Sequence, residues 1–470
     1  MARTVTRRGG LAIVLAGLVL IAVRLPFLRV PLDADEGGYA YLSRQWAAGG
    51  RLYGPVWVDR PQGLLLLYRG ITSLGRSPVL IHLGAIGLAL LLLAGVSLAA
   101  GAVAGRRAAL IGAVLVAVVG AAPRLQGFML NGELAAGAFA APAVAAALWF
   151  RRTDRLALLV GAGTLGAVAV LMKQSGFDGA VVGLAVALLA RSARAMLGYL
   201  AGLAVPLGLA ALQAALTSWS DWWFAVVGYR LDTSAGSRGG LAGRWHNITA
   251  DLPHLWPDLL PLAALGVLGL WWCARRRCGL PVLWLAAALV GFGGGVFFFP
   301  HYWMQLVGPA CLLGALALAA VPSRLATGAL ALLCLPALLF TGRVATSGTD
   351  QRDRLAVPDG RLLANRDIAP WLRSHSAARE QIYAFVSSAD LYYSTGRHTD
   401  FRYLWQANLD AIPGSVSQLA RYLAGPNGPG WVVLYARPEV VDPSGRIEQI
   451  LRTDYRLVTS IDGVRILRHD

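Results

Sequence analysis

Residues 79–103, VLIHLGAIGLALLLLAGVSLAAGAV, form one long apolar run, and residues 108–122, AALIGAVLVAVVGAA, form a second. Between them lie Arg106 and Arg107. A helix rises about 1.5 Å per residue, so about 20 apolar residues cross the hydrocarbon core of a bilayer. The sequence therefore predicts two membrane-spanning helices joined by a short basic turn.

The same pattern of apolar runs and short basic turns continues along the chain of 470 residues, which is 56% hydrophobic. It predicts a polytopic α-helical membrane protein with about 11 transmembrane helices. The expected spans are 11–29, 79–103, 108–122, 134–150, 156–172, 178–190, 195–216, 258–274, 280–299, 303–321 and 324–341.

Arginines occupy alternate loops between these runs, which indicates the orientation, because cytoplasmic loops are enriched in Lys and Arg. We therefore expect a cytoplasmic N-terminus, an outer C-terminus and a bacterial plasma membrane. The net charge of +17 is then a topology signal, and we expect no nucleic-acid partner. Arginine usage with a single lysine is typical of a GC-rich, actinobacterial genome. The arginines concerned are Arg3, Arg7, Arg8, Arg106, Arg107, Arg151, Arg152, Arg155, Arg191, Arg194, Arg275, Arg276, Arg277 and Arg324.

Two parts are expected, a membrane part over residues 1–344 and an extracytoplasmic α/β domain over 345–470. In the first outer loop, 30–78, residues 63–71 are apolar but too short to span, which predicts an interfacial helix. The other outer segments are expected at 123–133, 173–177, 217–257 and 300–302.

The C-terminal part contains short β-type runs bounded by turn residues. Residues 381–386 and 431–435 are predicted as buried strands, and 455–460 with 464–467 as a hairpin around Asp462-Gly463. Residues 409–424 are predicted as a helix.

Three acids, Asp33, Asp35 and Glu36, follow the first span in a chain that is only 14% charged. At the outer mouth of a helical bundle, a carboxylate can act as a general base on a hydroxyl group. The alternative is a solvated loop in which an Asp caps the helix expected around Tyr39.

Two cations lie on the same predicted face. Arg60 precedes the interfacial helix, and Lys173, the sole lysine, ends the fifth span. Both are candidate ligands for a phosphate group. The alternative for each is a cation that reaches the headgroup region along its own aliphatic stem.

Glu133, His301 and Tyr302 complete the candidate set on this face. A carboxylate at the edge of an apolar helix is costly in lipid, so Glu133 is expected to face a cavity, with a helix-capping acid as the alternative. His301 and Tyr302 can donate to a phosphate or a sugar hydroxyl. No cofactor is required by these residues, although Asp35 with Glu133 could hold a divalent cation.

The order of several short motifs resembles the lipid-phosphate-sugar-dependent glycosyltransferases of the C-type fold. This class includes family-39 protein mannosyltransferase relatives and aminoarabinose transferases. Residues 35–40, DEGGYA, are similar to the first outer loop of that class, and 59–63, DRPQG, to the element before its interfacial helix. Residues 300–306, PHYWMQL, resemble a late-span motif, and 391–397, LYYSTGR, the start of the outer domain. Arg60 stands where many members have Lys, and Glu133 is alone where they are acid-rich.

The resemblance implies an inverting transferase that moves a sugar from a polyprenyl-phosphate donor to a hydroxyl of an envelope glycan, lipid or protein. It implies Asp35 as the base and Glu36 as a supporting acid, while the residues alone leave Asp33 as the alternative base. Asp33 and Tyr39 are candidates for binding substrate. Membrane lipids are the further partners. A transporter or flippase of lipid-linked sugars, or a non-catalytic envelope assembly factor, is the alternative.

Overall fold

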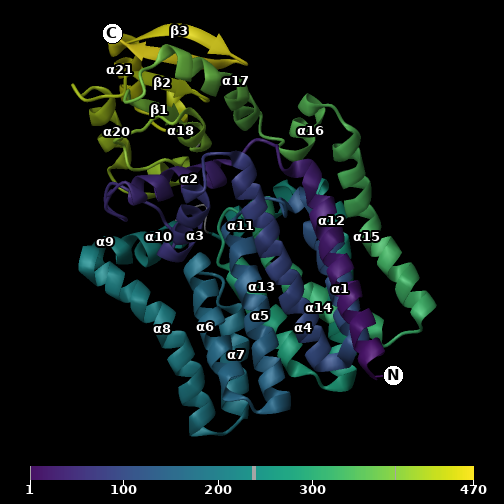
Figure 1. Cartoon of the computed structure of the whole chain (residues 1–470). Coiled ribbons are helices and arrows are strands. Elements are labelled where there is room, and N and C mark those ends of the chain that lie inside the picture. The colour runs from purple at the N-terminus through teal and green to yellow at the C-terminus, as the bar shows by residue number, and fades with distance from the viewer. Residues whose placement is uncertain (1, 236–239, 387) are drawn as a thin grey trace.

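The computed structural model describes residues 2–235, 240–386 and 388–470. A bundle of long helices forms its larger part, and the N-terminus lies at the end of the bundle that is opposite to the C-terminal sheet (Figure 1). Each apolar run predicted as a span contains a helix. The span predicted at 280–299 is too long, because its helix ends at Gly293, where three consecutive glycines begin, and residues 294–299 are not helical. These helices are α1 (Ala2–Arg24), α4 (Pro78–Val118), α5 (Gly132–Thr153), α6 (Leu156–Met172), α7 (Asp178–Leu189), α8 (Ala193–Thr217), α12 (Leu252–Arg276), α13 (Gly279–Gly293), α14 (Val307–Ala319, after the 3-10 turn Pro300–Leu306) and α15 (Ser323–Thr346).

Helix α4 contains the apolar run 79–103 and most of the run 108–122. The helix is interrupted at Ala104 and at Gly105, whose φ of 79° favours glycine. Beyond this break the chain folds back on itself. Ser97 Oγ therefore reaches the carbonyl of Ala109 and donates to it at 3.0 Å. The predicted pair of helices with a short basic turn is therefore confirmed as a hairpin.

Within the described residues, seven helical segments are long and apolar enough to cross a membrane, with the hairpin of α4 counted once. Three shorter apolar helices, α6, α7 and α13, pack among them. The chain is thus a polytopic helical membrane protein.

The arginine-bearing turns gather at one end of the bundle. Arg107 donates to the carbonyl of Val321 at 2.6 Å, and Arg152 donates to that of Val103 at 3.4 Å. These bonds join the turns that follow α14, α5 and the first half of α4. The side chains of Arg3, Arg7 and Arg8 lie outside the described residues.

The opposite end is covered by short helices from the segments predicted as outer loops. They are α2 (Ala34–Ala47), α3 (Gln62–Ser73), α9 (Trp219–Trp223), α10 (Tyr229–Ala235) and α11 (Leu241–Ala250). Helix α3 confirms a short helix over the predicted segment 63–71, with Leu64, Leu65 and Tyr68 buried and Leu66 exposed. Its position at the membrane interface stays a prediction. Residues 236–239 of the segment 217–257 lie outside the described residues.

The C-terminal part builds a four-stranded sheet with the order β1-β2-β4-β3. Strands β1 and β2 are parallel, and the other two pairs are antiparallel. The hairpin of β3 and β4 turns at Asp462 and Gly463, both with positive φ, as predicted. The strands are β1 (Ile382–Phe385), β2 (Trp431–Leu434), β3 (Tyr455–Ile461) and β4 (Val464–His469).

Helices surround this sheet and connect it to the bundle. The single helix predicted at 409–424 is wrong, because Pro413 interrupts it and separates α19 from α20. The helices are α16 (Thr349–Ala356), α17 (Gly360–His375), α18 (Asp390–Thr395), α19 (Gln406–Ala411), α20 (Ser415–Leu423) and α21 (Arg446–Asp454).

Helix α2 lies between the bundle and the C-terminal part (Figure 1). A Cβ at Gly37 would lie 2.3 Å from Cα of Asp390, so α2 and α18 approach closely at this point. The rings of Tyr41 and Tyr392 stack at 5.1 Å. The acid cluster at the start of α2 is therefore held directly against the C-terminal elements.

Candidate active site

A cavity of about 410 Å³ opens at the end of the bundle that α2 covers. It brings together residues that are far apart in the sequence, from α2, the segment before α3, the turn before α14, the start of α17 and α19. Six of the predicted site residues line it: Asp33, Asp35, Tyr39, Arg60, His301 and Tyr302. The wall also contains Asp59, Gln126, Arg230, Arg361, Trp405 and Asn408.

The first turn of α2 positions the acid cluster. Asp33 is the N-cap, and its Oδ1 accepts from the backbone N–H of Asp35 at 2.9 Å. Glu36 completes a capping box by accepting from the N–H of Asp33 at 3.2 Å. The capping interpretation of this cluster is therefore confirmed for Asp33, and it coexists with exposure of Asp35 to the cavity.

Asp35 is oriented by a neighbour one helical turn away. Its Oδ2 accepts from the hydroxyl of Tyr39 at 3.1 Å. Residues four apart in a helix lie on the same face, so this bond keeps the carboxylate directed along the cavity side of α2. Tyr39 itself is buried against Tyr68 and Trp405.

Asp33 is electrostatically distinct. Burial raises the pKa of Asp33 well above its usual value, and the negative charges of Asp35, Glu36 and Asp390 raise it further. The hydrogen bond from the N–H of Asp35 acts against this rise. A raised pKa favours the protonated form of the Asp33 carboxyl group.

Glu36 is 1% exposed and does not line the cavity. Its Oε1 accepts from the N–H of Leu130 at 2.7 Å, and its Oε2 lies 3.4 Å from Nε2 of His82. Glu36 thus connects the start of α2 to the segment 123–133 and to α4. The structure places it as a support behind the cavity wall.

Arg60 belongs to a cationic wall built on one carboxylate. Its guanidinium donates to Asp59 at 2.8 Å, and Arg230 forms an ion pair with the same carboxylate. Two guanidinium groups that share one carboxylate leave a net positive charge on this wall. Burial alone would lower the pKa of Arg60, but Asp59, Tyr39 and Asp35 raise it above its usual value.

Lys173 and Glu133 form a buried ion pair. The ammonium also lies 4.0 Å from the centroid of the Tyr302 ring. Glu133 is buried in protein, and its carboxylate is neutralised by the lysine. It lines neither of the two cavities of this site, so the expectation that it faces a cavity is not confirmed. Neither Lys173 nor Glu133 lines the cavity of about 410 Å³.

Lys173 lines a second cavity of about 230 Å³. Arg230 and Tyr302 belong to the walls of both cavities, so the two adjoin. Gln305, which donates to the carbonyl of Ser175 at 2.6 Å, also lines the smaller one. The cations of the site therefore border two adjoining cavities.

His301 lies in the turn Pro300–Leu306, immediately before α14. Its Nδ1 lies 2.9 Å from Oε1 of Gln126. Its ring stacks on Phe299 with centroids 5.9 Å apart. These contacts fix the imidazole at the cavity wall opposite the C-terminal elements.

A metal site would need several ligands at one place. Among the described residues, no group of three or more His, Cys, Asp or Glu side chains could hold an ion. Of the two residues considered as ligands, Glu133 is paired with Lys173, and Asp35 accepts from Tyr39. A divalent cation at Asp35 and Glu133 stays a prediction.

Sequence reasoning did not identify Asp59, Arg230 or Trp405 as members of this site. Asp59 directly precedes Arg60 in the sequence, and this adjacency could have identified it, because a buried cation usually forms an ion pair with a nearby acid. Trp405 comes from the C-terminal part, and no local pattern connects it with α2. Its contact with Gly38, where a Cβ would lie 2.6 Å from the indole ring, exists only in the folded chain.

Comparison with known proteins shows the fold. No family model matches this chain, and no curated protein is similar to it. Among solved structures, it is similar to ArnT from Cupriavidus metallidurans in the apo state, with a TM-score of 0.70, 16% identity and 97% of each chain covered. ArnT bound to undecaprenyl phosphate gives a TM-score of 0.66 at 15% identity, again over 97% of each chain.

A second group of similar structures is archaeal. AglB, an oligosaccharyltransferase from Archaeoglobus fulgidus in complex with an inhibitory peptide and a dolichol-phosphate, has a TM-score of 0.56 at 15% identity. The match covers 90% of this chain and 69% of that one. The chain therefore has the fold of the C-type membrane glycosyltransferases, as the resemblance of its motifs predicted.

Proposed function

We propose that this protein is an inverting glycosyltransferase that moves a sugar from a polyprenyl-phosphate donor to a hydroxyl group of the cell envelope. The observation that carries the proposal is the composition of one cavity wall. It combines a carboxylate, Asp35, with the two arginines that share Asp59. The similarity to ArnT bound to undecaprenyl phosphate and to AglB with a dolichol-phosphate supports the donor class.

The reaction assigns Asp35 as the general base. Its carboxylate takes the proton of the acceptor hydroxyl while that oxygen attacks the anomeric carbon of the sugar. The bond between the anomeric carbon and the phosphate oxygen breaks on the opposite face, so the configuration inverts. The products are the glycosylated acceptor, polyprenyl phosphate and a proton on Asp35.

The leaving phosphate gains negative charge as this bond breaks. Arg60 and Arg230 carry more positive charge than Asp59 neutralises, so they can stabilise the departing group. Arginine forms paired hydrogen bonds to phosphate oxygens, which also orients the donor. Lys173 lines the smaller, adjoining cavity, and its ion pair with Glu133 holds the ammonium in place.

The smaller cavity offers a route for the polyprenyl tail. Val290 on α13 lines this cavity and is 67% exposed on the outer surface of the bundle. An apolar, exposed residue at the mouth of a cavity suits a lipid tail that leaves toward the membrane. The phosphate would then lie where the two cavities meet, between Arg230 and Tyr302.

The proposal includes the topology predicted from the arginines. The chain would cross a bacterial plasma membrane about eleven times, with the N-terminus in the cytoplasm. The cavity and the C-terminal part would then lie on the extracytoplasmic side. The acceptor would be an envelope glycan, lipid or protein with a free hydroxyl, and the sugar a hexose or a pentose.

Purified full-length protein supplied with polyprenyl-phosphate sugars and envelope acceptors tests the function. The measurement is release of polyprenyl phosphate together with transfer of a radiolabelled sugar. Asp35→Asn should abolish both, whereas Glu36→Gln should retain measurable turnover. Asp367→Asn, an exposed acid on α17, is the matched control and should behave as wild type.

Two outcomes would contradict the proposal. Full activity of Asp35→Asn would remove Asp35 as the base. Movement of intact donor across a vesicle membrane, without release of polyprenyl phosphate for any donor tested, would favour a flippase instead.

A further inference from the structure

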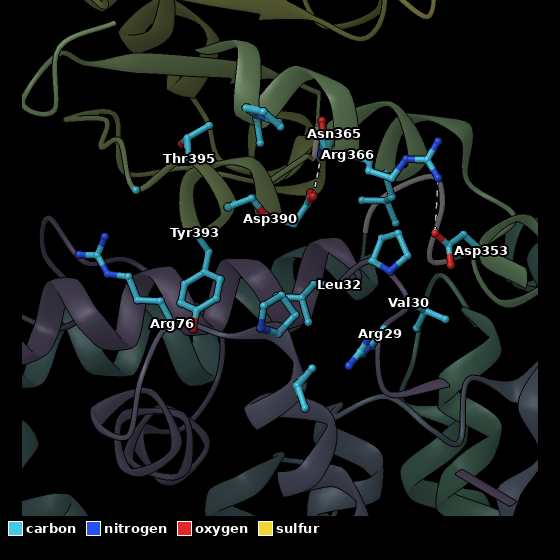
Figure 2. A pocket seen from close by; sticks show the side chains of 18 of the residues that line it. Arg29, Val30, Leu32, Arg76, Asp353, Asn365, Arg366, Asp390, Tyr393 and Thr395 are labelled. Atoms are coloured by element: carbon cyan, nitrogen blue, oxygen red, sulfur yellow. Dashed lines mark hydrogen bonds and ion pairs between the residues drawn. The ribbon is translucent and has the colours of Figure 1, made fainter. Parts of the chain in front are cut away.

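A third cavity, with a volume of about 650 Å³, is larger than the two described above. It lies on the other side of the acid cluster. One wall comes from the C-terminal part, with Asn365, Arg366, Asp390 and Tyr393, and the other from the first loop, with Arg29 (Figure 2). Leu362 lines this cavity and the reaction cavity, so the two cavities adjoin. The proposed transfer reaction uses none of the charged groups here.

The charge of this groove is predominantly positive. Its walls contain Arg29, Arg76, Arg366 and Arg373, against Asp353 and Asp390. Arg366 is already paired with Asp350 and Asp353, and Arg373 donates to the carbonyl of Ser394. Arg29 and Arg76 form no side-chain hydrogen bond or ion pair within the part of the chain that the structure describes.

Tyr393 is a buried donor without a partner in this groove. Its side chain is 6% exposed, and its hydroxyl has no hydrogen-bond partner among the described residues. Its ring reaches from α18 toward Arg76 and Leu32 (Figure 2). A buried hydroxyl left unpaired is costly, and an anion bound next to Arg76 would accept from it.

The groove lies at the level where the apolar spans end. The span of α1 ends at Phe27, two residues before Arg29, and the span of α4 begins at Pro78, two residues after Arg76. Leu25, four residues before Arg29, and Leu74, two residues before Arg76, are 52% and 77% exposed. Exposed apolar side chains therefore occur close in the chain to both arginines of the groove.

We propose that this groove binds the phosphate of an anionic membrane lipid, held by Arg29, Arg76 and the hydroxyl of Tyr393. Arginine pairs with phosphate oxygens through two parallel donors, and the tyrosine supplies a third. The acyl chains extend toward the exposed Leu25, just after α1, and Leu74, at the end of α3. Leu362 lines both the lipid groove and the reaction cavity. This proposal does not depend on the transfer reaction.

Native mass spectrometry of the full-length protein in detergent tests the site. The probes are phosphatidylglycerol, dioleoylglycerol, which lacks the phosphate, and inorganic phosphate. We expect wild type to retain phosphatidylglycerol and not dioleoylglycerol. Arg29→Gln with Arg76→Gln should weaken retention about tenfold or more, and Tyr393→Phe by less. Arg76→Lys should restore part of the binding.

Arg343→Gln is the matched control, because Arg343 is an arginine in the last turn of α15 outside the groove. Its phosphatidylglycerol binding should equal that of wild type. Since Arg29 and Arg76 are exposed at the groove rim, melting temperatures without lipid should match, and the single Arg76→Gln serves if the double variant does not fold. Equal lipid binding by wild type and the double variant would overturn the proposal. Displacement by millimolar inorganic phosphate would also overturn it, in favour of a soluble anion.

Discussion

The hydroxyl of Tyr39 donates to the carboxylate of Asp35 at 3.1 Å, one helical turn away along the cavity side of α2. This bond restricts the rotamers of Asp35 and leaves its other oxygen, Oδ1, without this donor. A base that is held in place loses less freedom when the acceptor hydroxyl binds. Tyr39 is therefore a positioning residue in the proposed reaction.

Tyr39→Phe should lower kcat about fivefold to tenfold, because one hydrogen bond of about 1 kcal/mol is lost while the ring stays buried. The KM for the donor should change little, since Tyr39 is not assigned to phosphate binding. Steady-state kinetics with a polyprenyl-phosphate sugar measure this split. Tyr41→Phe, which loses the 3.5 Å bond to the carbonyl of Thr399 and the 3.1 Å bond from its N–H, should keep the wild-type rate, because Tyr41 does not line the reaction cavity. Equal rates for wild type and Tyr39→Phe would contradict the positioning role.

The ion pair of Lys173 and Glu133 gives a second prediction. Removal of one partner from a buried pair leaves an uncompensated charge, which typically costs about 3–5 kcal/mol. Lys173→Met and Glu133→Gln should each lower the melting temperature, and the double variant should recover much of the loss. Thermal denaturation in detergent, followed by tryptophan fluorescence, completes this double-mutant cycle.

The same cycle separates stability from chemistry. The double variant regains packing but lacks the cation that lines the smaller cavity. Its rate of sugar transfer should therefore stay low even though its melting temperature recovers. Additive losses in melting temperature would show that the two side chains are not coupled.

The helical bundle was predictable because each span carries its own signal. An apolar run bounded by arginines predicts a membrane helix from local sequence alone. The two halves of α4 were predictable in this way, from two apolar runs separated by Arg106 and Arg107. The sheet hairpin was predictable from a different local signal, the turn residues Asp462-Gly463. The single helix predicted at 409–424 was wrong because Pro413, which has no backbone N–H to donate, divides the segment into α19 and α20.

The candidate site was predictable only in part, because sidedness identifies residues on one face but not their contacts. Asp35, Arg60 and His301 were placed together by counting spans, and all three line one cavity. Glu36 shows the limit of this reasoning, since its burial depends on the N–H of Leu130, which lies 94 residues away in the sequence. The part of Trp405 in the wall depends equally on how α2 packs against the C-terminal elements.

The close approach of Gly37 to Asp390 predicts a specific sensitivity. A methyl group at Gly37 would lie 2.3 Å from Cα of Asp390, which is backbone and cannot move alone. Gly37→Ala should therefore separate α2 from α18 and increase hydrogen exchange in both, with reduced transfer activity. Gly70→Ala on α3 is the control, since nothing lies within 4 Å of a Cβ there. Exchange rates in Gly37→Ala equal to wild type would show that the contact is looser.

Asp390 predicts a pH-dependent stability at the same junction. Burial raises the pKa of Asp390 from 3.8 to about 7, although Asn365 and Ser388 donate to its carboxylate. Between these two pKa values the folded protein binds a proton that the unfolded chain has released. The free energy of unfolding therefore falls as pH rises from about 4 to 7 and levels off above pH 7.

Asp390→Asn removes this titration and keeps a side chain of the same shape. The variant should gain in melting temperature relative to wild type as pH rises from 5 to 8, by an amount equivalent to at most about 3 kcal/mol, because only about two of these pH units lie below the folded-state pKa. Asp367→Asn, on the exposed face of α17, should show a constant difference over the same range. A difference for Asp390→Asn that does not change with pH would mean that the carboxyl group is already ionised in the folded protein at pH 5.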